Sequence, residues 1–181
     1  MKKNVVTYHL EMTDPVDHRR ATRGLDQIEA ARCEVPSPEL NRFFYTAVGG
    51  DWYWIDRLPW SYARWMDWLD RPEVQTWVAS HQGLPAGYFE LEAQSEGDVE
   101  IAYFGLLPGF AGRGIGGALL SHAVDRAWQM PARRVWVHTC TLDHPAALAN
   151  YETRGFRRFH STEADLDLPD VPPGPWPQAR S

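Results

Sequence analysis

Apolar and polar residues follow the two periods that are typical of strands and helices along most of this chain. Alternation, or a high content of β-branched and aromatic residues, predicts strands over residues 5–12, 25–33, 74–81, 85–93, 99–107, 133–140 and 156–160. Helices are predicted over residues 39–48, from Ser61 to just before Pro72, from Ala118 to just before Pro131, and from Pro145 to just before Gly155. Three consecutive strands, 74–107, therefore form a meander between helical segments.

Length and composition predict a single α/β domain with its own core. The chain has 181 residues, of which 44% are hydrophobic and 23% charged. Five prolines lie in residues 169–181, which predicts an extended tail there. The expected organisation is one domain over residues 1–168 followed by a proline-rich tail over residues 169–181.

The charge balance and the cysteines exclude several classes of protein. A formal charge of −6, from 24 acidic and 18 basic residues, argues against binding to nucleic acid or to an anionic membrane. The sequence has no apolar stretch of about 20 residues and no secretory h-region at its start, which predicts a cytoplasmic protein. Cys33 and Cys140 lack disulfide or zinc-ligand spacing, so we expect free thiols and no metal.

The sequence GRGIGG at residues 112–117 begins the helix that starts near Ala118. It matches the dinucleotide pattern G-x-G-x-x-G, but residues 108–111 separate it from the preceding strand, and no acidic residue follows about 20 positions later. No Lys-Ser/Thr pair follows, which excludes a P-loop. The physics that remains is an anion held by backbone N–H groups at a helix start, and the alternative is a tight turn alone.

Residues 99–120 and 135–156 resemble the two core motifs of the Gcn5-related N-acetyltransferase (GNAT) superfamily. The resemblance implies a mixed α/β fold with a mostly antiparallel sheet flanked by helices, in the order β-α-α-β-β-β-α-β-α-β. It also implies acetyl-CoA as co-substrate, with its pyrophosphate on the glycine-rich turn and its pantetheine arm along strand 99–107. The residues expected at this cofactor are Leu106, Leu107, Gly112, Arg113, Gly114, Ile115, Gly116, Gly117, Ala118 and His144. Two positions depart from the family pattern: Ala111 replaces Gln or Arg, and His144 replaces Asn.

Transfer to an amine requires a base, because an amine with a pKa near 10 is protonated at neutral pH. Glu100 is the candidate base, and alternation puts it on one strand face with Ala102 and Phe104. Glu90 on the neighbouring strand, or a water relay, could replace it, and a solvated strand residue is the alternative for Glu100.

The resemblance gives Tyr151 the role of proton donor to the departing CoA thiolate, the alternative being a core aromatic residue. A backbone N–H near Leu106 or Leu107 would then bind the tetrahedral oxyanion.

The acceptor is predicted from charge and from tryptophan. Five carboxylates lie between Glu90 and Glu100, and six of nine tryptophans lie between residues 52 and 77. A cationic acceptor follows as a hypothesis, with Trp54, Asp56, Trp60 and Glu90 as pocket residues. The alternative is a solvated hairpin above a tryptophan-filled core.

Together these features predict an acetyl-CoA-dependent N-acetyltransferase that acts by direct attack of a primary amine of a small molecule or peptide. An acyl-CoA sensor without turnover is the second hypothesis, and a nucleotide-dependent oxidoreductase the third. A covalent route through Cys140, two residues after His138, is a further alternative. The tryptophan content is compatible with a homodimer.

Overall fold

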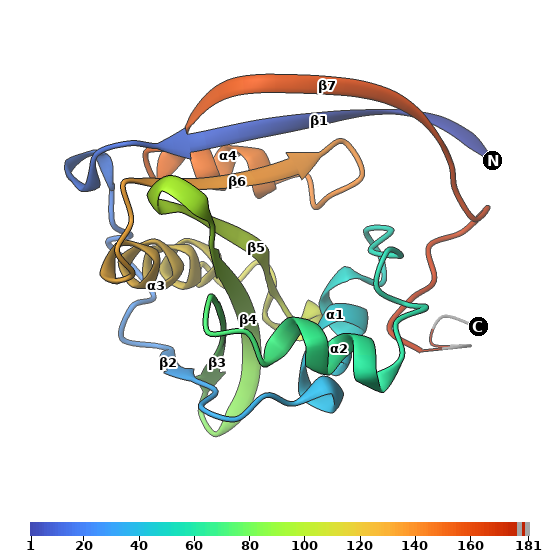
Figure 1. Ribbon diagram of the computed structural model, residues 1–181, viewed down its shortest axis with the longest axis horizontal. Helices are drawn as coiled ribbons and strands as arrows, with labels where there is room; N and C mark the ends of the chain where they lie inside the picture. Colours follow the sequence, from blue (N-terminus) through green and yellow to red (C-terminus); the bar gives the residue numbers. More distant parts are fainter. Residues whose placement is uncertain (177–178, 180–181) are drawn as a thin grey trace.

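The centre of the structure is a mixed sheet whose seven strands lie in the order β2-β3-β4-β5-β6-β1-β7 (Figure 1). The computed structural model describes residues 1–176 and residue 179. The strands are β1 Lys2–Met12, β2 Glu29–Arg32, β3 Val74–His81, β4 Leu84–Ala93, β5 Asp98–Leu106, β6 Arg134–Cys140 and β7 Arg157–Asp167. The helices in this part of the chain are α1 Pro38–Gly49, α2 Tyr62–Leu69, α3 Gly116–Gln129 and α4 Ala147–Thr153.

Local signals set the starts of α1 and α2. The Ser37 hydroxyl oxygen accepts a hydrogen bond from the Leu40 backbone N–H at 3.2 Å, and Pro38 takes the first helical position. The Ser61 hydroxyl oxygen accepts from the Arg64 N–H at 3.2 Å. These N-caps satisfy backbone donors that the first helical turn leaves unpaired, which is why the helices begin where the sequence predicts.

The two faces of the sheet are covered by different helices (Figure 1). On one face α3 buries Leu119, Leu120 and Val124 in the largest core cluster, and α4 contributes Tyr151 to it. On the other face α1 and α2 pack against β3, β4 and β5 in two smaller clusters that are rich in aromatic residues. Because both faces of the central strands are buried, their pairing register is strongly specified.

Strands β5 and β6 are the only parallel neighbours among the paired strands of the described chain. Their register covers three positions, from Asp98 opposite Arg134 to Glu100 opposite Trp136. Beyond these positions the pairing ends, while β5 continues to pair with β4 and β6 with β1. The two strands therefore separate in the middle of the sheet, and the candidate site lies at this opening.

Strand β1 lies between β6 and β7, although it comes first in the chain. Thr7 is opposite Cys140, and His9 is opposite both His138 and His160. The N-terminal strand thus joins the same half of the sheet as the last strand.

The predicted α/β class, the mostly antiparallel sheet and the 74–107 meander are confirmed. Three boundaries differ. The strand predicted over 25–33 is shorter and is a separate β2, so two strands precede the first helix. Helix α4 begins at Ala147 rather than at Pro145, because residues 144–147 form a turn closed by the Ala147 N–H on the His144 carbonyl at 2.8 Å. Strand β7 extends to Asp167 because it pairs with β1 along its length.

The C-terminal segment follows β7 and crosses to the end of α1 (Figure 1). The Leu168 side chain is buried, and the Gly174 N–H donates to the Gly50 carbonyl at 2.9 Å. Of the tail predicted over residues 169–181, residues 177, 178, 180 and 181 lie outside the described residues. None of the helices in the described chain combines the length and the apolar character that a bilayer crossing requires.

Candidate active site

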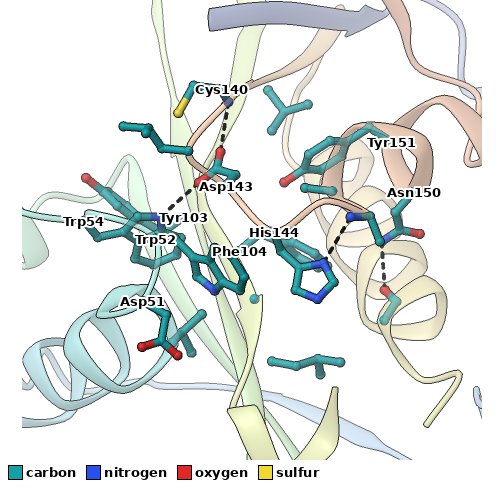
Figure 2. Close-up of a pocket in the computed structure, with 18 of the residues that line it drawn as sticks. Asp51, Trp52, Trp54, Tyr103, Phe104, Cys140, Asp143, His144, Asn150 and Tyr151 are labelled. Atoms are coloured by element: carbon teal, nitrogen blue, oxygen red, sulfur yellow. Dashed lines mark hydrogen bonds between the residues drawn. The ribbon is translucent and has the colours of Figure 1, made fainter. Parts of the chain in front are cut away.

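A cavity of about 830 Å³ lies where β5 and β6 separate. Its walls come from the end of α1, the loop 51–56, the second half of β5, the glycine-rich turn, the end of β6, the residues around α4, the middle of β1 and the end of β7. Figure 2 shows Trp54, Asp143 and Cys140 on one side of this cavity and Tyr151 on the other. Side chains from distant parts of the sequence therefore face one space.

The glycine-rich turn forms one end of the cavity. Gly112 and Gly114 have φ angles of +76° and +78°, and a side chain at either position would meet open space. Both line the cavity, as do Ala111, Gly116 and Gly117. Positive φ favours glycine here, because a side chain strains the backbone in this left-handed conformation even where the surrounding space is open.

The same turn presents unpaired donors. Helix α3 begins without a side-chain N-cap, and within the described chain no hydrogen bond engages the backbone N–H groups of residues 112–118. A helix start carries about half a positive charge, so these N–H groups have the chemistry to bind an anion. The sequence prediction of an anion site without lysine is compatible with this geometry.

Four residues predicted at the cofactor do not line the cavity. The side chains of Ile115 and Ala118 are buried in the core, and the Arg113 guanidinium lies 5.3 Å from the Phe110 ring. The Leu107 N–H donates to the Ala86 carbonyl at 2.9 Å, which corrects its prediction as an oxyanion donor. Leu106 and His144 do line the cavity.

Tyr151 projects from α4 into the cavity (Figure 2). The residue is 6% exposed, and no hydrogen bond to its hydroxyl is formed within the described chain. Burial, and secondarily the nearby Asp143 carboxylate, raises the pKa of the Tyr151 phenol above its ordinary value. The Asn150 side chain donates to the Gly116 carbonyl at 3.3 Å and ties α4 to the start of α3. Tyr151 is thus a protonated phenol held near the glycine-rich turn.

The His138 side chain separates Glu100 from the cavity. The Glu100 side chain is buried and does not line the cavity, whereas His138 does. A Glu100 carboxylate oxygen lies 3.2 Å from Nδ1 of His138, and its other oxygen accepts from the Gln94 amide at 2.8 Å. The hydrogen bond from His138 to Glu100 is the main cause that raises the pKa of His138, and partial desolvation of the ring opposes it.

A β-bulge changes which residues share a face with Glu100. The register between β4 and β5 shifts at Ala102, because Leu91 is opposite Ile101 and Glu90 is opposite Tyr103. After the shift Phe104 packs in the cluster beneath α3, and Tyr103 packs with α1 and α2. The prediction that Glu100 shares a face with Phe104 is therefore wrong, since simple alternation takes no account of the extra residue.

Asp143 organises the wall opposite Tyr151. One carboxylate oxygen accepts from the Thr139 hydroxyl at 2.7 Å. The same oxygen accepts from the Cys140 N–H at 3.0 Å, and the other accepts from the Trp54 indole N–H at 3.3 Å (Figure 2). Cys140 is a free thiol whose pKa is raised by burial and then by Asp143.

The predicted acceptor residues divide into two groups. Trp54 and Asp56 line the cavity, whereas Trp60 and Glu90 do not. Glu90 is 1% exposed and accepts from Arg57 Nη1 at 2.8 Å, from the Trp68 indole N–H at 2.7 Å and from the Asn41 amide at 3.0 Å.

The tryptophan cluster already contains a cation of this chain. The Arg57 guanidinium carbon lies 4.6 Å from the Trp60 and Trp68 ring centroids and 4.2 Å from the Tyr103 centroid. The prediction that Trp60 and Glu90 bind the acceptor cation is therefore wrong, because the cation that they surround is Arg57 of this chain.

The sequence did not indicate His138 as a base for direct acetyl transfer; it named this residue only beside Cys140. Its only local signal is its place on the same strand face as Cys140, since the Glu100 contact depends on the β5–β6 pairing.

Among the described residues no group of three or more His, Cys, Asp or Glu could hold a metal ion.

Comparison with known proteins agrees with this geometry. Residues 39–156 match the sequence profile of the acetyltransferase (GNAT) family. Uncharacterized N-acetyltransferases of Mycobacterium tuberculosis and Mycobacterium bovis are each 35% identical to this chain over 103 residues. That alignment covers 55% of this chain and 66% of either relative, just under two thirds of its length.

Solved structures share the fold. A GCN5-related N-acetyltransferase from Kribbella flavida superposes with a TM-score of 0.64 at 19% identity, over 93% of this chain and 60% of that one. A GCN5-related N-acetyltransferase from Sphaerobacter thermophilus has a TM-score of 0.63 at 20% identity, over 94% of this chain and 53% of that one. At these identities the similarity establishes the architecture alone.

Proposed function

This chain belongs to the acetyltransferase (GNAT) family, and we propose that it transfers an acetyl group from acetyl-CoA to a primary amine of a small molecule or peptide by direct attack. The observation that carries the proposal is that one cavity is lined by the glycine-rich turn, Tyr151 and His138. An anion site, a proton donor and a proton acceptor are the groups that such a transfer requires.

The turn fits the diphosphate of acetyl-CoA. Gly112 and Gly114 leave open space where side chains would stand, and the start of α3 offers N–H donors without a side-chain cap. When bound, acetyl-CoA would supply the activated acyl group as a thioester. The absence of Lys or Arg from the described cavity lining leaves backbone amides as the diphosphate donors.

His138 is proposed to accept the proton from the amine, with Glu100 as its positioning residue. A carboxylate can only accept hydrogen bonds, so the Glu100 contact holds the proton on Nδ1 of His138. The lone pair is then on Nε2, which can act as a base. The raised pKa of His138 strengthens this base, as the amine pKa near 10 demands.

Tyr151 is proposed to protonate the departing thiolate. A thiol has a pKa near 8.5, and the pKa of Tyr151 is raised above its ordinary value of 10.0, so the phenol carries its proton at neutral pH. The raised pKa of Cys140 disfavours the thiolate that a covalent acetyl-cysteine route would require.

The proposal is tested by calorimetric titration with acetyl-CoA and by thiol release across a panel of amines, on the natural chain and on Gly114→Ala. Strain at positive φ should weaken acetyl-CoA binding in Gly114→Ala by about tenfold or more. The matched control is Gly109→Ala, since Gly109 has open space and no positive φ, and we expect its affinity to be unchanged.

Two results would contradict the proposal. Equal acetyl-CoA affinity of Gly114→Ala and Gly109→Ala would remove the turn from the cofactor site. Tight binding without thiol release for any amine would favour the sensor hypothesis instead. Melting temperatures of both variants identify any general loss of folding.

Tyr151→Phe should lower kcat by about 100-fold while leaving the KM for acetyl-CoA within about twofold, because only the proton donor is lost. The phenol makes no hydrogen bond within the described chain, so its removal should leave folding intact. Tyr8→Phe is the control, since Tyr8 is half-buried on β1 and does not line the cavity. Full activity of Tyr151→Phe in steady-state assays would reduce Tyr151 to a packing residue.

A further inference from the structure

We infer that the acceptor is a primary amine with an aromatic or apolar body and no carboxylate beside the amine. This inference rests on the proposed function and assigns its acceptor class. It is argued from the charges that line the cavity, from the position of Arg57, and from the rings opposite Tyr151.

The first observation is the sign of the charges in the cavity. Away from the glycine-rich turn, the ionisable lining residues in the described chain are Asp51, Asp56, Asp143, His138 and His144, together with Cys140 and tyrosines. Neither Lys nor Arg is among the described lining residues. A cationic ammonium is stabilised by these carboxylates, whereas a carboxylate on the acceptor would meet like charge without a partner.

The second observation is that the nearest arginine in the sequence is already bound elsewhere. Arg57 follows Asp56, but its guanidinium is ion-paired with Glu90 at 2.8 Å and is buried. It lies against the ring of Tyr103, which does line the cavity. Arg57 therefore cannot bind an acceptor carboxylate without breaking a buried ion pair.

The third observation is a fixed aromatic wall. The Trp54 and Tyr103 rings meet edge to face at 4.9 Å with an angle of 70°, and the Trp54 indole N–H is held by Asp143 at 3.3 Å. Opposite this wall the Tyr151 hydroxyl, on a residue 6% exposed, points into the cavity and forms no hydrogen bond within the described chain (Figure 2). Preformed rings bind a flat apolar body at a low entropic cost.

These contacts also assign a specificity residue. Both carboxylate oxygens of Asp143 accept hydrogen bonds from the protein, whereas Asp56 is exposed at its place in the cavity wall. Asp51, the third lining carboxylate, is half-buried, so Asp56 is the most accessible carboxylate to attract the acceptor's ammonium and to repel a carboxylate beside it. The discrimination should appear in acceptor affinity as well as in turnover.

The test compares tryptamine, tryptophan and tryptophan methyl ester by calorimetry with coenzyme A present, and by thiol release at saturating acetyl-CoA. Tryptamine should bind about 100-fold more tightly than tryptophan, because a like-charge contact costs about two tenfold steps of affinity. The methyl ester keeps the bulk of tryptophan without its charge and should bind within about tenfold of tryptamine. Equal affinities for tryptamine and tryptophan, or no binding of tryptamine, would overturn the inference.

Asp56→Lys provides the matched variant. Placing a cation in the cavity wall should reduce the ratio of tryptamine to tryptophan affinity by about tenfold or more. Asp67→Lys makes the same charge change at an exposed position on α2 outside the cavity, and its ratio should stay that of the natural chain. An unchanged ratio in Asp56→Lys would show that Asp56 does not select the acceptor.

The inference and the proposed function fail in distinguishable ways. Selective binding of tryptamine without thiol release supports this acceptor class and contradicts the transferase. Thiol release with tryptophan as fast as with tryptamine supports the transferase and contradicts this acceptor class.

Discussion

Replacing Glu90 by Gln is expected to lower the free energy of unfolding by about 3–5 kcal/mol, because it leaves the Arg57 guanidinium as an uncompensated buried charge. Arg57 and Glu90 are 7% and 1% exposed and are joined at 2.8 Å. For a chain of this size the melting temperature should fall by roughly 6–20 °C, measured by thermal unfolding.

The matched control is Glu152→Gln, which also removes a carboxylate from an arginine. Arg158 and Glu152 are joined at 2.7 Å, but their side chains are 47% and 41% exposed. An exposed pair contributes at most about 1 kcal/mol, so the control should change the melting temperature little. Equal effects of the two substitutions would refute the claim that Glu90 neutralises a buried cation.

The Arg57–Glu90 pair also has a consequence for the cavity. The Arg57 backbone N–H donates to the Tyr45 hydroxyl at 3.1 Å, and the preceding residues 51–56 form one wall of the cavity. A folded Glu90→Gln variant should therefore bind tryptamine more weakly, because the segment that carries Trp54 and Asp56 loses its buried anchor. Calorimetry on the variant, below its melting temperature, measures this effect.

Replacing His138 by Gln should lower kcat/KM for the amine by about 100- to 1,000-fold, the contribution expected of a general base. Acetyl-CoA affinity should not change, since the anion site lies at the glycine-rich turn. His160→Gln is the control, because His160 is an exposed histidine that does not line the cavity. Activity of His138→Gln close to that of His160→Gln would exclude His138 as the base.

The pH profile separates the base from its positioning residue. His138 accepts a proton only when neutral, so the rate of the natural chain should rise with pH through the His138 pKa, which is raised above 6.5. Glu100 is the first cause of that rise, with smaller contributions from Asp143 and Asp56, and His9 faces the ring at 6.0 Å. Glu100→Gln should therefore move the midpoint of the profile to lower pH. A midpoint unchanged in Glu100→Gln would contradict the coupling.

Much of the candidate site could be predicted from sequence because its signals are local. Glycines at 112 and 114 indicate positive φ, and the apolar period after Ala118 indicates the helix that they begin. Tyr151 was expected from the resemblance to the second GNAT motif, and the structure places it in the cavity wall.

The roles of Glu100, Glu90 and Trp60 could not be predicted in the same way. Alternation along β5 fails at the Ala102 bulge, and a bulge depends on how two strands fit together. A tryptophan-rich segment has the same composition whether it surrounds a substrate cation or Arg57. Only the contact between Arg57 and Glu90, 33 residues apart, decides between them.

The sequence by itself determined the helices, most of the strands, the glycine-rich turn and the family, because periodicity, capping and turn chemistry act between residues that are close in the chain. The tertiary structure alone decided that β1 lies between β6 and β7, that Glu100 reaches the cavity through His138, and that Arg57 is turned away from it. These features depend on which distant surfaces bury each other. Their free energy comes from pairing and desolvation across the fold, which no local pattern of residues records.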